Sequence, residues 1–467
     1  TAFSQDPLTV GLARRAETFG RDGADWALYL FSWTEYEAAL IAGGPARAAR
    51  VRVSAATTYN GGEPVTVRAE NVRFDDYGNV EESIEYDLAG QPYRRTLNRY
   101  AQDTAAGRWL TGALVRQQIF ARAGGSWAAE PISETRADFN ADGDPATTAP
   151  DARGRITASR QWAGGGDFVD TRYTYDAWGH QTTVTTYGEY GTEARYAAAA
   201  PRMARSEYDA ALFGLYPVTQ TNPLGHQVVA AYDARLGLPV QVTDPNGAVT
   251  AYAYDAFGRL TAIARPGDTL AAPSLRYVYT DGSAPSRTET YQREVSGCAA
   301  CEHGTVEFYD GLGRVVQTRR EAADGRQTVV NTTYDALGRV TVSYLPVLEP
   351  AGLSFARPAG WEARPRTYTE FDALGRAVRV IGPDGATALA AYRGPRTAAL
   401  DPAGRQTVSE ADAFGRTVAV YEYQAQALAA PDFGQPADAV THYTYDGRGA
   451  LTRVDTLSTT TVITYNT

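Results

Sequence analysis

The two cysteines of this chain lie in one short segment, GCAACEH, as Cys298 and Cys301, and His303 follows two residues later. This spacing predicts a disulfide within a turn, which would suit an exported protein and would leave no odd thiol. Two reduced cysteines with a structural role are one alternative. A metal half-site of both thiolates and His303 is another, although a structural zinc normally takes four ligands. Haem attachment needs the histidine directly after the second cysteine, and redox catalysis needs a thioredoxin-like setting; the sequence offers neither.

A second segment, DFNADGD, carries oxygen ligands at alternate positions: Asp138, Asn140, Asp142 and Asp144. Its opening imitates a calcium-binding loop of the EF-hand type, in which carboxylate and amide oxygens surround the ion. That loop needs a glutamate at its twelfth position, where this chain has Ala149. An acidic turn of this kind also forms without a metal. We therefore expect no cofactor, and calcium at these four residues stays an alternative.

Residues for nucleophilic or hydrolytic catalysis are scarce. The histidines His180, His226, His303 and His442 are scattered along the sequence. The chain contains no GxSxG elbow, phosphate-binding glycine loop or HExxH motif. The many aspartates that precede glycines are better explained as turn formers than as acid–base pairs. The sequence therefore predicts a protein that is not an enzyme.

These aspartates belong to a short turn that recurs along the chain. Copies include YDLAGQ (86–91), YDAWGH (175–180) and YDAFGR (254–259), with others at 309, 334, 371, 411 and 445. Recurrence of a short motif at spacings of some tens of residues marks stacked supersecondary units. The residues that we assign to the structural turns are Tyr254, Asp255, Gly258, Arg259, Tyr309, Asp310, Gly313, Arg314, Tyr334, Asp335, Gly338, Arg339, Phe371, Asp372, Gly375, Arg376, Asp412, Gly415 and Arg416.

One copy, TAYAYDAFGRLTAI, shows how such a unit folds. Tyr252 and Tyr254 are two residues apart, so both rings leave the same face of a strand. Asp255 can accept a hydrogen bond from the backbone two residues on, and Gly258 can adopt the positive φ that closes the turn. Arg259 begins the return strand and is expected to contact nearby carboxylates or tyrosine faces. Because a lone hairpin is barely stable, the copies should pair side by side in a long twisted sheet.

Composition agrees with an all-β fold that has many tight turns. The 467 residues include 30 tyrosines and 45 glycines but only one methionine. Tyrosine favours half-buried pleated surfaces, and glycine allows turns with positive φ. The formal net charge is −10 without a basic tract, so nucleic acid is a poor candidate partner. No run of about 18 apolar residues predicts a membrane span.

The phrases YDALGRVT, EFYDGLGRVVQT and DPNGAVTAYAYDAFGRLTAI resemble the RHS or YD-repeat family. This family includes bacterial rearrangement-hotspot proteins, shell components of insecticidal toxin complexes, wall-associated proteins and animal teneurins. The similarity is strongest from about residue 170 to 450, and a weaker echo lies at 99–120. The resemblance implies repeated β-hairpins that wind as a long twisted sheet into a spiral shell or barrel. It also implies a longer secreted or cell-surface polypeptide.

The repeats are unevenly distributed. We assign residues 1–165 to a β-rich N-terminal region, which forms either the opening turns of the same sheet or a small β-domain. Residues 166–467 form the YD-repeat β-shell. Linker-like breaks fall at 140–155 and 345–366, but neither has the low complexity of a disordered linker.

These features predict a non-enzymatic, extracellular scaffold that encloses or presents a cargo, a toxin or a partner. The partners would be the remainder of a longer polypeptide, an enclosed cargo or neighbouring subunits. One alternative is an adhesive protein that binds cell-surface glycans, for which the tryptophans to consider are Trp109, Trp127, Trp162 and Trp361. Another is a subunit of a sheath or filament that assembles through open strand edges, such as TTTVITYNT at the end of the chain.

Overall fold

The computed structural model shows an all-β chain, as the sequence predicts. The described residues are 2–4, 12–22, 25–41, 47–59, 64–104, 109–123, 125–139, 153–164, 167–187, 201–209, 214–282, 285–298, 301–322, 325–352, 354–423, 427–458 and 462–466. Among them, 35 strands belong to one hydrogen-bonded sheet. We divide this sheet into a first arc, a middle arc and a later arc.

The first arc contains the longest strands of the described sheet. Its strands are β1 (Ala2–Phe3), β2 (Ala13–Asp22), β3 (Asp25–Leu40), β4 (Arg47–Thr58), β5 (Val65–Phe74), β6 (Val80–Tyr86), β7 (Pro92–Asp103), β8 (Leu110–Ala123), β9 (Ser126–Trp127), β10 (Ser133–Asp138) and β11 (Ala158–Gly164). The middle arc has shorter strands. They are β12 (Asp167–Tyr175), β13 (Gln181–Tyr187), β14 (Pro201–Tyr208), β15 (Pro217–Thr221), β16 (Gln227–Asp233) and β17 (Leu238–Thr243).

The later arc holds most copies of the repeated turn and one short 3₁₀ helix. Its elements are β18 (Val249–Tyr254), β19 (Leu260–Ala264), β20 (Leu275–Thr280), β21 (Ser286–Arg293), β22 (Glu302–Tyr309), β23 (Val315–Glu321), β24 (Arg326–Tyr334), β25 (Val340–Tyr344), β26 (Val347–Pro350), η4 (Trp361–Ala363), β27 (Arg366–Phe371), β28 (Ala377–Ile381), β29 (Thr387–Arg393), β30 (Arg396–Leu400), β31 (Gln406–Ala411), β32 (Thr417–Tyr423), β33 (Ala439–Tyr445), β34 (Leu451–Ser458) and β35 (Val462–Asn466).

The strands form an antiparallel meander in which nearly every strand pairs with its sequence neighbours. The exceptions are local: β10 pairs with β8 beside the short β8–β9 hairpin, and β24 pairs with both β25 and β26. Because β11 pairs with β12, the two regions divided at residue 165 belong to one continuous sheet. A β-bulge recurs where a strand enters a repeat turn, as between Ala253 and Tyr254, and it increases the local twist.

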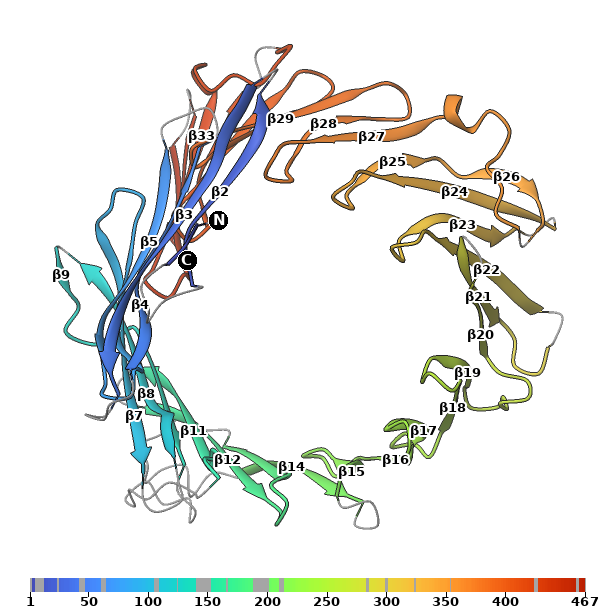
Figure 1. The fold of residues 1–467 in the computed structure, drawn as a ribbon, viewed down its shortest axis with the longest axis horizontal. Coiled ribbons are helices and arrows are strands. Elements are labelled where there is room, and N and C mark those ends of the chain that lie inside the picture. Colours follow the sequence, from blue (N-terminus) through green and yellow to red (C-terminus); the bar gives the residue numbers. More distant parts are fainter. Residues whose placement is uncertain are drawn as a thin grey trace.

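This twist curves the ribbon until its two ends overlap. Figure 1 shows the chain as a ring, in which the strands of the later arc return to lie beside those of the first arc. The Tyr93 and Phe414 rings meet with centroids 4.7 Å apart, and Arg416 Nη2 donates to Tyr93 Oη over 2.9 Å. On another hairpin, the Arg448 guanidinium lies over the Trp162 ring at 5.5 Å. The winding sheet that the sequence predicts is therefore confirmed.

Buried cores form where insertions cover the sheet. In β30–β32, Ala398, Val408 and Tyr423 are buried beneath Phe433 of the segment 427–438. In β22–β24, the insertion at 345–366 places Phe355 against Phe308, with ring centroids 5.6 Å apart. These insertions therefore act as covers of single-layer sheet, which would otherwise expose both faces to water.

The same insertion satisfies buried polar groups. Gln317, Asn331 and Arg319 are all buried. Gln317 Nε2 donates to Asn331 Oδ1 over 2.8 Å, and Arg319 Nη2 donates to the Ala356 carbonyl over 2.8 Å. Buried polar groups without partners are costly, so this network helps to fix the position of the insertion on the sheet.

Candidate functional site

The repeated turn is closed by a set of hydrogen bonds that we call the turn clasp. Asp255 Oδ1 accepts from the backbone N–H groups of Phe257 and Arg259, each at 2.9 Å. Arg259 Nε donates to Asp255 Oδ2 over 2.7 Å. The Gly258 N–H donates to the Asp255 carbonyl over 3.1 Å, and Gly258 has φ of 79°. The turn therefore needs an acceptor at its first position and a glycine at its fourth.

The same clasp recurs in the later arc with almost unchanged geometry. Its aspartates are Asp310, Asp335, Asp372, Asp401 and Asp412, and its arginines are Arg314, Arg339, Arg376, Arg405 and Arg416. The matching glycines, Gly313, Gly338, Gly375, Gly404 and Gly415, all have φ between 76° and 83°. The Arg314 guanidinium and the Arg314 and Leu312 amides lower the pKa of Asp310 below its ordinary value of 3.8. This carboxylate therefore stays ionised and favours the closed turn.

Most clasp arginines also contact the next hairpin. The Arg314 guanidinium lies 4.6 Å from the centroid of the Tyr334 ring, and its Nη1 donates to the Asp335 carbonyl over 3.3 Å. Arg339 repeats this arrangement on Phe371, also at 4.6 Å. The sequence predicts contacts of this arginine to carboxylates or to tyrosine faces, and Arg314 makes both at once. Stacking of this kind stabilises neighbouring hairpins relative to one another.

The tyrosine of the motif joins hairpins through its hydroxyl group. Tyr334 Oη donates to the Val315 carbonyl over 2.8 Å, and Tyr254 Oη donates to the Pro239 carbonyl over 2.9 Å. Burial raises the pKa of Tyr254, which favours the neutral, hydrogen-bond-donating form. The acceptor lies at or near the start of the return strand in the preceding hairpin. Tyr309 is an exception, because its hydroxyl donates to Glu307 Oε2.

Sequence reasoning missed this pairing of hydroxyl and carbonyl, although the sequence does carry a signal for it. The tyrosine directly precedes the turn aspartate in most copies of the motif, whatever its distance from the preceding turn. Equivalent bonds run from Tyr175, Tyr208, Tyr232, Tyr279, Tyr392 and Tyr445. A ring chosen only for apolar contact would not need the hydroxyl at so many copies.

The middle arc lacks the clasp arginine. His180 takes its place in YDAWGH, where its Nδ1 lies 2.9 Å from Asp176 Oδ2 and its ring stacks on Tyr208 with centroids 4.8 Å apart. In the next hairpin the position is occupied by Tyr216, which stacks on Tyr232 at 4.9 Å. These two turns keep an aromatic contact between hairpins without a clasp arginine, and in the turn between β16 and β17 Arg235 pairs with Asp233 of its own turn.

The cysteines form a disulfide within the turn that follows β21. Cys298 and Cys301 are bonded to each other, so neither offers a free thiolate to a metal. His303 Nε2 lies 3.4 Å from the carboxylate of Glu294. The turn is held to a neighbouring loop by Ser296, whose hydroxyl donates to Asp268 Oδ1 over 2.7 Å. The disulfide is thus the arrangement present in this structure among the predicted alternatives.

The candidate calcium ligands lie mostly outside the described residues. Asn140, Asp142 and Asp144 belong to that undescribed part of the chain. Asp138 is described, and its Oδ2 accepts from Arg160 Nη2 over 2.8 Å. Within the described part, no group of three or more His, Cys, Asp or Glu side chains is arranged to hold a metal ion. Calcium binding therefore stays a prediction.

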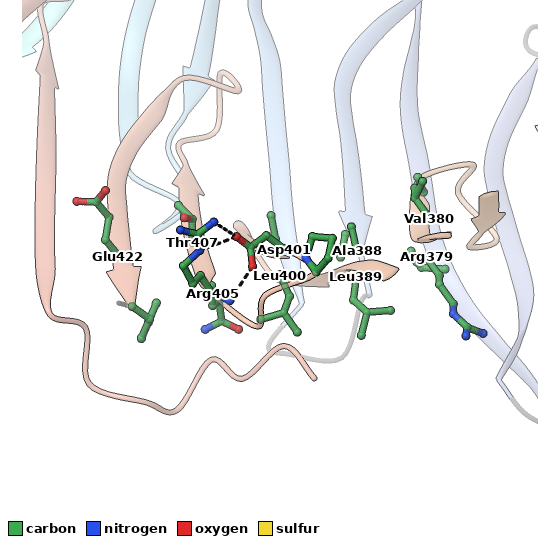
Figure 2. Close-up of a pocket in the computed structure, with 16 residues that line it drawn as sticks. Arg379, Val380, Ala388, Leu389, Leu400, Asp401, Arg405, Thr407 and Glu422 are labelled. Atoms are coloured by element: carbon green, nitrogen blue, oxygen red, sulfur yellow. Dashed lines mark hydrogen bonds and ion pairs between the residues drawn. The ribbon is translucent and has the colours of Figure 1, made fainter. Parts of the chain in front are cut away.

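A groove of about 910 Å³ lies in the later arc, between β28 and β32. Its charged side chains include Arg379, Asp401, Arg405 and Glu422. Figure 2 shows Asp401 and Arg405 joined to each other, with Arg379 and Glu422 at opposite ends. The Arg405 amide and guanidinium lower the pKa of Asp401, whereas a general acid needs a raised one. The groove therefore presents a turn clasp without a poised acid–base pair.

The tryptophans considered for glycan binding lie on separate elements. Trp109 precedes β8 and meets Tyr77 edge-on, with centroids 5.7 Å apart. Trp361 lies in η4 and meets the Tyr344 ring at 4.7 Å. Trp127 and Trp162 belong to β9 and β11. The lining of the groove in Figure 2 includes none of these four residues, so glycan binding stays a prediction.

Comparisons with known proteins match this geometry. A family described as RHS Repeat matches residues 232–270, and a domain of unknown function, DUF6443, matches residues 284–377. No curated protein matches the chain in sequence. Within the described residues, no helix combines the length and apolar character needed to cross a membrane.

Solved structures with a similar fold belong to toxin complexes. The crystal structure of TcdB2-TccC3 has a TM-score of 0.70 and 16% identity, over 96% of this chain and 29% of that chain. TcdB2-TccC3 without its hypervariable C-terminal region has a TM-score of 0.71 and 14% identity, over 96% of this chain and 31% of that chain. The Photorhabdus luminescens Tc holotoxin pore with a TccC3 mutation has a TM-score of 0.71 and 15% identity, over 96% and 31% of the two chains.

This chain thus spans 29% to 31% of the length of the chains it matches. At these identities the likeness concerns the fold. Together with the RHS repeat match, it confirms the resemblance to the RHS/YD-repeat family that the recurring turns predict.

Proposed function

We propose that this RHS/YD-repeat protein is a non-enzymatic scaffold whose curved β-shell encloses or presents a cargo or partner outside the cell. The scaffold role is supported by the RHS repeat and by the similar fold of the toxin-complex structures. The observation that carries the proposal is the closure of the ribbon. Its two ends are joined where Phe414 packs on Tyr93 and Arg416 donates to the same tyrosine.

The contacts that the repeated side chains make also support a scaffold role. The repeated aspartates and arginines are engaged with one another in the turn clasps, and the tyrosine hydroxyls are engaged with carbonyl groups. A wall held by repeated local contacts can be long without a thick core. An extracellular location is supported by the disulfide between Cys298 and Cys301, since such bonds persist in oxidising compartments.

Purification of the protein from its source, followed by cryo-electron microscopy, tests the enclosure. We expect density inside the ring and a second polypeptide, or a further part of the same one, that resists added protease. The matched comparison is Phe414→Ser, which removes the ring contact that closes the shell, against Val51→Ser at an exposed position within β4. Protease should reach the cargo faster in the first variant only. An empty ring, or equal digestion in both variants, would contradict the proposal.

Thiol labelling of the same preparation tests the location. Cys298 and Cys301 should stay unlabelled under denaturing conditions until a reductant is added. Complete labelling without reductant would show a reducing compartment and would contradict secretion.

A further inference from the structure

The turns of an antiparallel meander alternate between the two rims of the ribbon, because each strand reverses direction. One rim, which we call the clasp rim, carries the turns 176–180, 255–259, 310–314, 335–339, 372–376, 412–416 and 446–450. The other, the opposite rim, carries the turns between β2 and β3, β6 and β7, β8 and β10, β15 and β16, β19 and β20, and β21 and β22. Each rim is therefore a row of turn tips.

Where the ribbon overlaps itself, the clasp rim is covered. The tip of the turn 412–416 is Phe414, which packs on Tyr93 near the start of β7. A Cβ atom added at Gly447, in the next turn, would lie 2.5 Å from Cβ of Ala121 and 2.6 Å from Cδ1 of Ile132. The clasp rim of the later arc is thus seated on strand ends at the opposite rim of the first arc.

A third turn makes the same kind of contact. A Cβ atom added at Gly20, near the end of β2, would collide with Cβ of Ala373 in the turn 372–376. Gly20 lies at the opposite rim, like Tyr93 and Ala121. The contact between layers is consequently heterologous: it joins the clasp rim of one layer to the opposite rim of another.

Over the rest of the ring the same positions of the clasp rim are uncovered. Phe257, Leu312 and Leu337 occupy the tip position that Phe414 holds, and they are 84%, 78% and 76% exposed. Trp178 at the same position is 57% exposed. Large apolar side chains that recur at one position and protrude into water mark a surface that binds another protein surface.

The opposite rim is uncovered over the same stretch and is also apolar. Leu224, in the turn between β15 and β16, is 80% exposed. Val295, in the disulfide-bonded turn, is 57% exposed, and Leu270, between β19 and β20, is exposed as well. The clasp rim and the opposite rim, which contact each other where the chain overlaps itself, are therefore both exposed over the rest of the ring. Among the described residues, no second layer covers them there.

We propose that these two surfaces bind each other between copies of this chain, so that the rings stack head to tail. The clasp rim of one copy would dock on the opposite rim of a second copy, with Phe257, Leu312 and Leu337 in the role that Phe414 has within one chain. Such a heterologous contact does not close on itself, so each added ring leaves a free rim for the next. The result is a stack that lengthens the shell.

Sedimentation velocity of the whole chain over a range of concentrations tests this proposal. The wild-type protein should form a concentration-dependent series of oligomers. The clasp-rim variant Phe257→Asp, Leu312→Asp, Leu337→Asp and the opposite-rim variant Leu224→Asp, Val295→Asp should each be monomeric alone. Mixed together they should form a dimer, because each supplies the rim that the other lacks. Val51→Asp, at an exposed position within β4, is the matched control and should still assemble.

If the multiple variants fold poorly, the single change Leu312→Ser still tests the proposal. It should raise the midpoint concentration of assembly roughly tenfold. Far-ultraviolet circular dichroism checks that each variant keeps its sheet. A wild-type chain that stays monomeric overturns the proposal, and the rims are then covered by another part of a longer polypeptide. Rim variants that do not form a dimer on mixing also overturn it. Neither result bears on cargo inside the ring, so the scaffold proposal is tested separately.

Discussion

The later arc and the middle arc of the sheet are built from the same hairpin, but different side chains join the hairpins. In the later arc, Arg314 and Arg339 each bind the aspartate of their own turn and stack on the next aromatic ring. In the middle arc, His180 and Tyr216 occupy the arginine position. His180 contacts Asp176 of its own turn and stacks on the next ring, and Tyr216 stacks on the next ring.

The hydroxyl contacts vary between copies. Tyr208 and Tyr232 of the middle arc lie 3.3 Å and 3.2 Å from their carbonyl acceptors, although Tyr175 of the same arc lies 2.7 Å from its own. Tyr279 and Tyr334 of the later arc lie 2.8 Å from theirs. The comparison shows that different residues form the turn itself and the contact between one hairpin and the next. Aspartate and glycine are enough to make a hairpin, whereas arginine adds a charged contact that joins one hairpin to the next.

The largest effect should come from the glycine that both arcs share. Gly313 has φ of 76° with no neighbour within 4 Å of an added Cβ, so Gly313→Val tests the backbone conformation alone. We expect a loss of about 2 kcal/mol in local stability, because a β-branched residue strongly disfavours the left-handed region. Hydrogen exchange of β22 and β23 measures this loss.

Gly311 provides the control within the same turn. It lies outside the positive-φ region and also has open space around an added Cβ. Gly311→Ala should leave stability unchanged or raise it slightly, because alanine restricts the unfolded chain. Equal exchange in the two variants would show that the turn does not depend on the left-handed conformation.

Removal of a clasp arginine should have the next largest effect. Arg339→Ala loses the stack on Phe371 and the hydrogen bond to the Asp372 carbonyl, and we expect a cost of about 1.5 kcal/mol. Hydrogen exchange should rise in β27 as well as in β25, because the contact crosses to the next hairpin. Arg320→Ala, at an exposed strand position, should change neither strand. If the increase in hydrogen exchange is confined to the turn 335–339, Arg339 does not stabilise the contact between this hairpin and the next.

The tyrosine hydroxyl should contribute less than the arginine. Tyr334→Phe removes the donor to the Val315 carbonyl and should cost about 1 kcal/mol in urea unfolding or in local exchange. Tyr232→Phe in the middle arc should cost less, because its bond is longer. Phe371→Tyr is the converse change, because this copy of the motif has a phenylalanine without a hydroxyl group. It should raise the protection of this hairpin against hydrogen exchange. A larger loss of stability for Tyr232→Phe than for Tyr334→Phe would contradict the expectation that the hydroxyl contributes less in the middle arc.

The smallest effect should be a pH-dependent gain in the middle arc. The pKa of Asp176 is lowered below its ordinary value, because the hydrogen bonds from His180 and neighbouring amides outweigh its partial desolvation, so it is negative above about pH 4. Arginine carries a permanent positive charge on a planar guanidinium. His180→Arg should therefore raise the protection of β12–β14 against hydrogen exchange at pH 7, and the gain should be lost as the pH falls far enough to protonate Asp176.

His180→Gln serves as the uncharged control for this change. It should show no gain in protection over the wild type at pH 7. A gain for His180→Arg that persists unchanged after Asp176 is protonated at low pH would show that the size of the side chain, and not its charge, limits the middle arc.

Much of this protein is readable from local sequence. The aspartate and glycine of each turn act within five residues, so the recurrence of YDAFGR and its relatives predicts the hairpins and their rows. The resemblance then supplies the winding of the sheet. The candidate disulfide was also readable, because Cys298 and Cys301 are the only cysteines and lie three residues apart.

Other features could not be read from the sequence because they join distant residues. The carbonyl acceptors of the tyrosine hydroxyl groups lie 15 or more residues away, as for Tyr254 and Pro239. The tip residues Phe257 and Phe414 belong to the same motif and look equivalent in sequence. One is 84% exposed and the other packs on Tyr93.

The sequence by itself determined the hairpin, because hydrogen bonds within a turn depend only on neighbouring residues. Tertiary structure alone decided which turns are covered. The bulge at each turn adds a small twist, and only the sum of these twists brings residues 412–416 onto strands some 320 residues earlier, as the separation of 323 between Arg416 and Tyr93 records. The same motif is therefore an internal contact in one place and an exposed surface in another.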